Sequence, residues 1–250
     1  MISLTSAPTL KPLPTSPRSS QAPPPEPLLT SLPFYGRALS EYVSGFALDL
    51  TSLRRCAVLD VGSGASSFAV EASRREIEVA AVDPLYGCSV ETLATHVQLD
   101  YARVSVDSCR RLKGEKLLEQ EEIEQHRRAA AQRFLSDYES GFLHNRYLGG
   151  ALPSLPFLDR SFDLVLCGHV LLGAYARFDD SQVITACREL LRVSAGVVRI
   201  GPFEKVPTTR RDALLARLQA EGIAPQIASC VDAHGRTVPQ GLLILRRATR

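Results

Sequence analysis

Residues 56–83 contain two short apolar runs separated by a glycine-rich turn and a helical stretch. The runs read CAVLDV and IEVAAVD, and the segment between them begins with Gly62 and Gly64 and continues at helical spacing. A strand, a helix and a second strand at this spacing form a right-handed βαβ unit, which requires a parallel sheet. This unit constrains the fold more than any other feature of the chain, and it predicts an α/β protein.

Later apolar runs extend the same sheet. FDLVLC at 162–167, GVVRI at 196–200 and GLLILR at 241–246 are predicted as further parallel strands, with helical segments between them. The chain has 250 residues, of which 45% are hydrophobic, so it can bury one sizeable core. Its net charge of +2 is too small to indicate a nucleic-acid surface, and no apolar run reaches the roughly 18 residues of a transmembrane helix. Six cysteines without a C-x-x-C pair favour a reducing compartment and give no support to a zinc site.

Two segments depart from this alternation. Residues 1–32 are rich in proline, serine and threonine and are predicted to be a disordered tail, which leaves 33–250 as the folded domain. Residues 85–147 are helical and charged, and they are longer than a crossover between parallel strands requires. We predict that they form a helical cap over the substrate pocket.

The predicted cap has an apolar stripe at helical spacing and a charged opposite side. The stripe would pack onto the pocket and comprises Ala130, Ala131, Phe134, Leu135 and Tyr138. The charged side would face water and includes Glu121, Glu122, Arg127 and Arg128. A dimerisation arm that uses the same stripe is the alternative.

The glycine turn is compatible with three kinds of ligand. A phosphate loop requires Gly-Lys-Ser/Thr after the glycines, and the sequence there is Ala-Ser-Ser, which excludes it. A dinucleotide fold prefers G-x-G-x-x-G, and the third glycine is replaced by Ser67. S-adenosylmethionine sites use acid-x-G-x-G, which Asp60 to Gly64 match. A tight turn that binds no ligand also remains open.

Asp83 ends the second predicted strand, about twenty residues after the glycine turn. A carboxylate at this place accepts hydrogen bonds from both ribose hydroxyls of a nucleoside ligand, in NAD and in S-adenosylmethionine alike. The pair Asp83-Pro84 also fits a turn opener.

Further motifs downstream favour one family. The sequence LPSLPFLDRSFDLVLCGHVLL, followed by ACRELLRVSAGVVRIGP, resembles class I S-adenosylmethionine-dependent methyltransferases over about residues 55–201. Within that family, the pattern is similar to a small-molecule, methyltransferase type 11-like bacterial branch whose substrate is unassigned. The resemblance implies a Rossmann-like fold: a mostly parallel seven-stranded sheet with helices on both faces and a helical insertion after the second strand.

The resemblance also implies where the cofactor binds. Asp60 would order the glycine loop or hold the ammonium group, Asp83 would bind the ribose, and the residues after the fourth strand would line the sulfonium. Relatives carry an aspartate where this chain has Ala151, so the adenine would rest on backbone and apolar contacts. The full set is Asp60, Gly62, Ser63, Gly64, Asp83, Ala151, Leu152, Cys167 and Gly168.

His169 is the candidate general base, because it follows the fourth strand at the edge where α/β proteins bind ligands. A histidine that only forms a structural hydrogen bond is the alternative. Tyr35 and Arg37 are candidates to close over the cofactor carboxylate.

These features predict a cytoplasmic methyltransferase, monomeric or homodimeric, with a small-molecule substrate and without metal, nucleic acid or membrane. An NAD(P)-dependent oxidoreductase and a catalytically inactive binding protein with the same fold remain alternatives.

Overall fold

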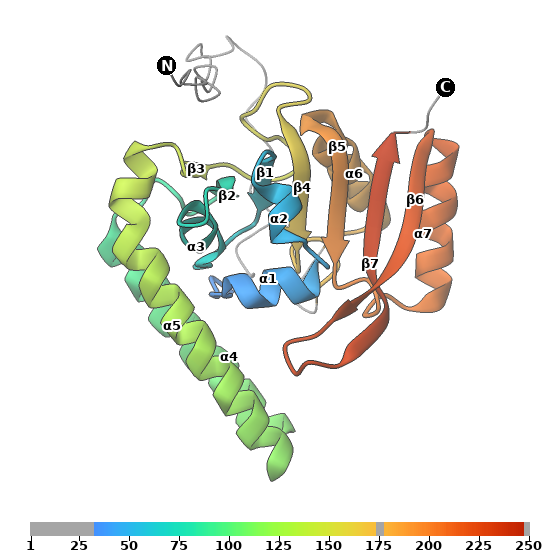
Figure 1. Ribbon diagram of the computed structural model, residues 1–250. Helices are drawn as coiled ribbons and strands as arrows, with labels where there is room; N and C mark the ends of the chain where they lie inside the picture. The colour runs from blue at the N-terminus through green and yellow to red at the C-terminus, as the bar shows by residue number, and fades with distance from the viewer. Residues whose placement is uncertain (1–32, 174–177, 248–250) are drawn as a thin grey trace, which may run out of the picture.

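A computed structural model describes residues 33–173 and 178–247, so the predicted tail at 1–32 lies outside the described residues. A seven-stranded sheet forms its centre, in the order β3-β2-β1-β4-β5-β7-β6 (Figure 1). The strands are β1 Ala57–Val61, β2 Glu78–Asp83, β3 Tyr147–Gly149, β4 Phe162–Gly168, β5 Ser194–Gly201, β6 Ile223–Val231 and β7 Thr237–Arg247. The helices are α1 Leu39–Gly45, α2 Leu50–Leu53, α3 Phe68–Ser73, α4 Val90–Arg111, α5 Glu115–Leu143, α6 Asp180–Val193 and α7 Thr208–Ala220.

Strands β1 to β5 are parallel to one another, and β7 is antiparallel to both β5 and β6. This confirms the Rossmann-like, mostly parallel seven-stranded sheet, with the helical insertion after β2. The direction of the last strand was predicted wrongly, since 241–246 was expected to be parallel. A short turn at 232–236 joins β6 to β7, and two strands joined in this way can only pair antiparallel.

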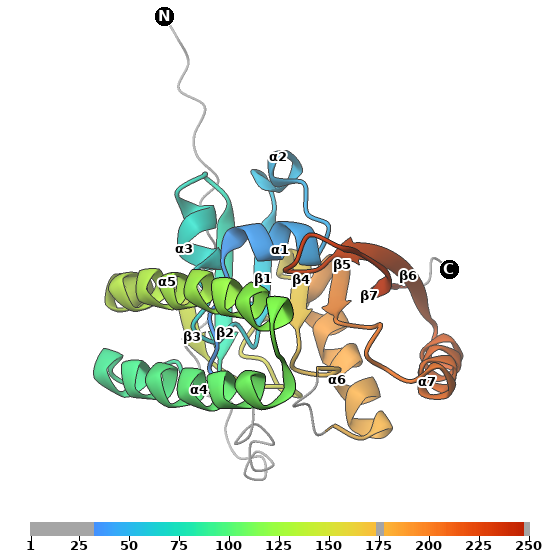
Figure 2. The same ribbon diagram turned by 90° about the horizontal axis from the view of Figure 1, so that it is seen from below.

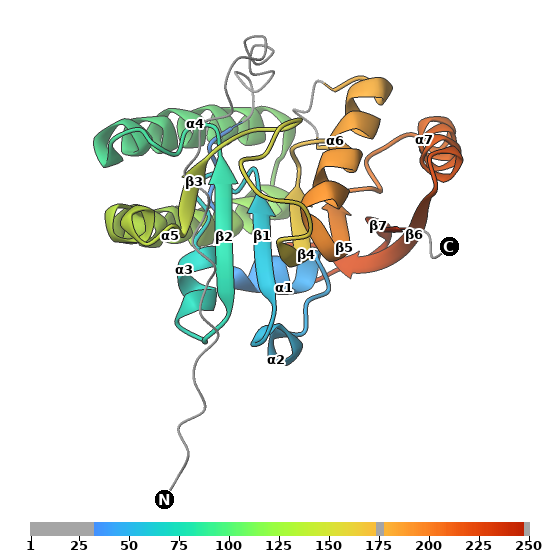
Figure 3. The same cartoon turned by 90° about the horizontal axis from the view of Figure 1, so that it is seen from above.

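Two apolar clusters cover the two faces of the sheet. One contains the apolar faces of α6 and α7, and the other contains those of α1, α3, α4 and α5. Figure 3 shows α6 and α1 on opposite sides of the central strands. Helices on both faces explain why β1, β2 and β4 are almost continuously buried and apolar rather than alternating.

The insertion is a hairpin of two long helices that is built into the core. Helices α4 and α5 run side by side past β2 and β3 and extend beyond the carboxyl edge of the sheet (Figures 1 and 2). Phe134 of α5 is fully buried, and its ring contacts four other aromatic rings. We call these five residues the aromatic cluster: Phe34, Tyr86, Phe134, Tyr138 and Tyr147.

The predicted apolar stripe of α5 faces inward. Ala130, Ala131, Phe134 and Tyr138 are buried and Leu135 is partly buried. A dimerisation arm that uses this stripe is therefore wrong, because the protomer itself covers it.

One of the residues expected to face water does not. Glu121, Glu122 and Arg128 are exposed as predicted, but Arg127 is half-buried. Its guanidinium forms a bidentate ion pair with Glu41 of α1, which draws the side chain inward.

Candidate functional site

The glycine turn after β1 is shaped by protein contacts on both of its glycines. Gly62 and Gly64 have φ of +68° and +57°, which glycine adopts without strain. A side chain at Gly62 would collide with Val170, and a Cβ at Gly64 would lie 3.1 Å from the carbonyl oxygen of Tyr35. Substitution of either glycine therefore tests folding before it tests ligand contact.

Residues 34–37, here called the strap, lie between the glycine turn and the insertion. A Cβ on Gly36 would be 2.8 Å from the carbonyl oxygens of both Ala65 and Arg127, and 3.0 Å from the amide nitrogen of Ala131. Only glycine fits in this space, because backbone atoms on two sides cannot yield. The strap thus couples the turn to α5.

The amino end of α3 is occupied by protein acceptors. The amide of Ser67 donates to the carbonyl oxygen of Arg37 at 3.0 Å, and the amide of Phe68 donates to Oγ of Ser66 at 3.1 Å. A dinucleotide fold uses such amides to hold a pyrophosphate. Here these two amides are already satisfied by the chain.

Asp60 lies at the end of β1 with almost no exposure and accepts a hydrogen bond from the Tyr42 hydroxyl at 2.7 Å. Burial raises the pKa of its carboxyl to about 6, although the neighbouring Ser63 hydroxyl, the Tyr42 bond and the charge of Arg37 oppose this shift. The nearby Ser63 hydroxyl is buried and has no hydrogen-bond partner among the described residues. The Asp60 carboxylate and the Ser63 hydroxyl lie close together because β1 passes into the glycine turn between these two residues.

Asp83 lies at the end of the neighbouring strand β2. One carboxylate oxygen accepts from the amide of Gly64 at 3.0 Å, and the other accepts from the amide of Leu85 at 3.1 Å. Burial raises its pKa to about 6. The Leu85 bond is the turn opener considered from the sequence, and it leaves further lone pairs on both oxygens for a ligand.

The positive charge of Arg37 acts on Asp60 and opposes the rise of its pKa. Desolvation lowers the pKa of its guanidinium, and the charge of Arg127 lowers it further. Within the described residues Arg37 forms no ion pair, because Glu41 pairs with Arg127 instead. A desolvated guanidinium without an anion is a ready site for a ligand carboxylate.

Tyr35, the other candidate on the strap, has a packing role. Its ring stacks on Tyr101 of α4 with centroids 4.4 Å apart, and the guanidinium of Arg127 lies 5.3 Å from its centre. The side chain is buried between the strap and the insertion. The structure therefore separates Tyr35 from Arg37, which sequence reasoning had grouped together.

The segment after β3 lies beside Asp83. The amide of Gly150 donates to the Asp83 carbonyl oxygen at 3.2 Å, Ala151 forms an isolated bridge with Ser154, and Leu152 is buried. The predicted adenine-side segment is thus adjacent to the predicted ribose carboxylate.

Cys167, Gly168 and His169 end β4 at the same edge. Cys167 is fully buried, and this burial raises the pKa of its thiol. A Cβ on Gly168 would lie 3.2 Å from the ring of Phe46, which places this backbone against the loop after α1.

His169 adopts φ of +60°, a conformation that costs energy for a residue with a side chain and that is common at functional sites. The residue is exposed, yet desolvation by surrounding protein lowers its pKa well below the usual range. The positive charges of Arg37, Arg127 and Lys205 lower it further. The direction of the shift favours the neutral form of the imidazole.

Two site residues were missed by sequence reasoning. The Tyr42 hydroxyl holds Asp60, and the Tyr86 hydroxyl donates to the carbonyl oxygen of Gly64 at 2.6 Å. Both tyrosines come from segments that looked like ordinary packing. Only their position opposite the glycine turn in space reveals the role.

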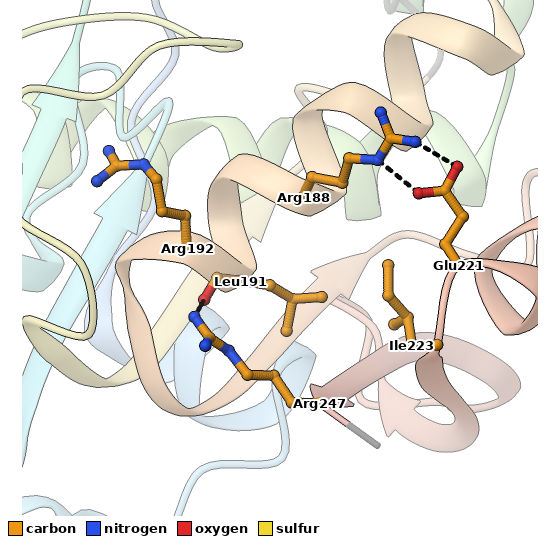
Figure 4. Close-up of a pocket in the computed structure, with 7 residues that line it drawn as sticks. Arg188, Leu191, Arg192, Glu221, Ile223 and Arg247 are labelled. Carbon is orange, nitrogen blue, oxygen red and sulfur yellow. Dashed lines mark hydrogen bonds and ion pairs between the residues drawn. The ribbon is translucent and has the colours of Figure 1, made fainter. Parts of the chain in front are cut away.

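A separate hollow of about 330 Å³ lies between the carboxyl end of α6 and the strands β6 and β7 (Figure 4). Arg188 pairs with Glu221 there, and the Arg247 guanidinium donates to the carbonyl oxygen of Leu191 at 3.0 Å. The arginines are thus engaged in structural bonds, and this hollow lies at the opposite edge of the sheet from Asp60 and Asp83.

Two negative findings apply to residues 33–173 and 178–247. No group of three or more histidine, cysteine, aspartate or glutamate side chains is placed to hold a metal ion. No helix in these ranges is both long and apolar enough to cross a membrane.

Comparison with known proteins gives one relative in sequence. No family model matches the chain. An uncharacterised protein of Methanocaldococcus jannaschii is 28% identical over 179 residues, which are 67% of this chain and 76% of that protein.

Solved structures share the general arrangement at low identity. A protein of Methanococcus maripaludis matches with a TM-score of 0.44 and 14% identity, covering 85% of this chain and 90% of that one. Magnesium protoporphyrin IX methyltransferase of Synechocystis, solved with bound SAM, matches with 0.43 and 11%, covering 80% and 74%. The 1,6-didemethyltoxoflavin-N1-methyltransferase of Burkholderia thailandensis matches with 0.42 and 14%, covering 82% and 77%. The fold is established by the strand order of the sheet itself.

Proposed function

We propose that this protein is an S-adenosylmethionine-dependent methyltransferase that acts on a small molecule. One arrangement carries the proposal: the buried carboxylates of Asp60 and Asp83, at the ends of β1 and β2, and the Arg37 guanidinium on the strap form no ion pair within the described residues. A ligand with an ammonium group, a carboxylate and a ribose would satisfy all three. The methionine and ribose parts of S-adenosylmethionine provide these groups.

The residues present fit this cofactor. Asp60 would hold the ammonium and Arg37 the carboxylate, while the unpartnered Ser63 hydroxyl would gain a partner. Asp83 would accept the ribose hydroxyls through its remaining lone pairs. The glycine turn and the segments ending β3 and β4 complete the predicted set, with Gly62, Gly64, Ala151, Leu152, Cys167 and Gly168.

The cofactor supplies a methyl group on a sulfonium, and the protein supplies position and a proton acceptor. Methyl transfer to the acceptor would be an in-line displacement, for which Asp60, Asp83 and Arg37 would hold the cofactor in position. Positioning provides most of the rate in such a displacement. If the acceptor carries a proton, His169 would be the candidate to take it, because this residue follows β4 at the sheet edge where the cofactor would bind.

Nicotinamide-dependent oxidation is the less favoured alternative. The α3 amides that would hold a pyrophosphate already have acceptors in Arg37 and Ser66. The buried Asp60 and Asp83, which form no ion pair within the described residues, also weigh against an inactive binding protein, because buried carboxylates destabilise a fold that has no use for them.

We also propose that the α4–α5 hairpin caps the substrate pocket. It leaves the sheet after the predicted ribose strand β2 and returns at β3, and it extends beyond the carboxyl edge (Figure 1). A cap of this kind would exclude water from the sulfonium. A cytoplasmic location, a monomeric or dimeric state and the absence of nucleic-acid and membrane partners remain predictions.

A thermal-shift titration with S-adenosylmethionine, S-adenosylhomocysteine and NADH tests the proposal. The first two should stabilise the fold, by about 2.7 kcal/mol at a hundredfold excess over the dissociation constant. NADH should have no effect. A shift with NADH and none with the other two at millimolar concentration would refute the proposed function.

A further inference from the structure

Both polar backbone groups of Gly64 are bound by one short turn of the chain. This turn, here called the β2 turn, comprises residues 83–86 and is closed by the Tyr86 amide, which donates to the Asp83 carbonyl oxygen at 3.1 Å. The Asp83 carboxylate accepts from the amide of Gly64 at 3.0 Å. The Tyr86 hydroxyl donates to the carbonyl oxygen of Gly64 at 2.6 Å. The end of β2 thus holds the glycine turn that follows β1.

These two bonds fix the backbone conformation at Gly64. Its amide belongs to the peptide plane that joins residues 63 and 64, and its carbonyl belongs to the plane that joins residues 64 and 65. Rotation about either backbone bond of Gly64 turns one of these planes and breaks one of the two hydrogen bonds. The restraint is needed because glycine has more backbone freedom than any other residue, and Gly64 has φ of +57°.

The Tyr86 hydroxyl is a permanent donor in this arrangement. The side chain is only 4% exposed. Burial raises the pKa of the hydroxyl well above its usual value, and the charge of Asp83 raises it further. The hydroxyl therefore keeps its proton at neutral pH and donates it to the Gly64 carbonyl oxygen.

The insertion and the strap hold the ring of Tyr86. Phe134 of α5 stacks on this ring with centroids 5.6 Å apart, and Tyr138 of the same helix lies 5.8 Å away. Phe34 of the strap and Tyr147 of β3 meet the ring edge-on, at 6.4 Å and 5.4 Å. Aromatic pairs at these separations attract one another beyond their area of contact. The insertion thus supports the side chain whose hydroxyl binds the glycine turn.

We propose that Tyr86 is a positioning residue for the cofactor, and that it transmits the placement of the insertion to the glycine turn. The inference rests on the proposed function, in which the glycine turn faces the methionine part of the cofactor. A turn that samples several conformations binds its ligand more weakly, in proportion to the competent fraction. By restraining Gly64, Tyr86 keeps this fraction high. An insertion that is only a cap would leave cofactor affinity unchanged.

The first test removes the hydroxyl alone. Tyr86→Phe should weaken the binding of S-adenosylhomocysteine in calorimetry by about three- to tenfold, which corresponds to one hydrogen bond between neutral groups. Tyr147→Phe is the matched control, because Tyr147 belongs to the same aromatic cluster and its hydroxyl donates to Asp137 of α5 at 2.9 Å. Chemical denaturation should show similar losses of stability in the two variants, while Tyr147→Phe keeps its affinity. Equal affinity in Tyr86→Phe and wild type would make Tyr86 merely structural.

The second test requires no ligand. The bond to Asp83 protects the Gly64 amide from hydrogen exchange, which NMR follows in the ligand-free protein. Tyr86→Phe should speed this exchange at least threefold relative to the amides of β4, which report on global stability. Tyr147→Phe should leave the ratio unchanged. An unchanged ratio in Tyr86→Phe would show that the hydroxyl does not restrain the turn, and it would overturn the proposal.

A double-mutant cycle tests the part of the insertion. Phe134→Leu removes the ring that stacks on Tyr86 and should weaken S-adenosylhomocysteine binding at least threefold. The same change should have a smaller effect in the Tyr86→Phe background, because the hydroxyl that transmits it is gone. Phe142→Leu, on an exposed position of α5, is the control and should change affinity in neither background. Equal effects of Phe134→Leu in both backgrounds would overturn transmission through Tyr86.

The outcomes separate this inference from the proposed function. A wild type that does not bind S-adenosylhomocysteine refutes the proposed function, and this inference with it. A wild type that binds S-adenosylhomocysteine no more tightly than Tyr86→Phe overturns the inference alone.

Discussion

Buried carboxylate oxygens lie in two regions of the carboxyl edge of the sheet, and the protein donates hydrogen bonds to them in only one of the two regions. Asp60 and Asp83, at β1 and β2, each accept hydrogen bonds from the protein, whereas Oε2 of Glu204, beyond β5, accepts none. The first half is also enclosed by the strap, the aromatic cluster and α5. A functional site is most precise when the surrounding protein holds its residues in place. The first half therefore has the prearranged geometry that a cofactor site requires.

The largest expected effect tests whether the insertion belongs to the first half. Phe134→Ala should destabilise the fold by about 3–5 kcal/mol, because it empties the centre of the aromatic cluster. Phe142→Ala is the control on the same helix, since Phe142 is 41% exposed, and it should cost far less. Chemical denaturation measures both. If the two variants are equally stable, α5 is a detachable cap rather than part of the core.

Arg37→Met sharpens the comparison through binding. Loss of a charge-assisted bond to the cofactor carboxylate should weaken S-adenosylhomocysteine binding at least tenfold, since such bonds contribute roughly 1.5–3 kcal/mol. The fold should keep its stability, because the guanidinium has no ion-pair partner in the described chain. The exposed Arg54 provides the control, and Arg54→Met should change neither quantity. Unchanged affinity in Arg37→Met, measured by calorimetry, would remove Arg37 from the cofactor site.

The smallest expected effect is a pH dependence of cofactor affinity that arises from Asp60 and Asp83. The pKa values of Asp60 and Asp83 are raised to about 6 in the ligand-free protein. A bound ammonium and ribose favour the ionised carboxylates, so cofactor affinity should be constant above pH 7 and fall as the pH drops through 6. Titrations between pH 5 and 8 measure this, and Asp60→Asn should flatten the profile. Affinity that rises toward pH 5 would contradict the assignment.

In the ligand-free protein, Asp60 and Asp83 should increase the stability of the fold as the pH falls, which is the opposite of their effect on cofactor affinity. A carboxyl whose pKa is raised on folding binds its proton more tightly in the folded state than in the unfolded one. Its contribution to stability therefore increases as the pH falls from 7 toward 4. Thermal melts without ligand, compared between wild type and Asp60→Asn, separate this contribution from the binding effect.

The sequence predicted the parts of the molecule that depend on local pattern. Apolar runs and the glycine turn indicated the βαβ unit, the sheet and the insertion, because burial on both faces and tight turns leave a direct trace in composition. The placement of Asp60, Asp83 and His169 at strand ends followed from the same rule.

Contacts between segments that are distant in sequence could not be predicted from local sequence patterns. The bond from Tyr42 to Asp60, the close fit of Gly36 and the unsatisfied Glu204 each depend on segments that meet only in the folded chain. The inward turn of Arg127 was missed for the same reason, since its partner Glu41 is distant in sequence. The antiparallel β7 was missed because strand direction is set by the connecting turn rather than by the apolar run.

The strap imposes an order on the assembly of the protein. Residues 34–37 leave the ribosome before both of the segments between which they lie, the glycine turn and the stretch of α5 around Arg127 and Ala131. Contacts between segments so far apart in sequence form late, after the intervening chain has been closed into a loop. A nascent chain that ends before α5 thus lacks one wall of the space that Gly36 fills. We expect that such a chain cannot yet bind the cofactor, although it already contains β1 and β2. Residues 34–37 are therefore among the last parts of the domain to become ordered.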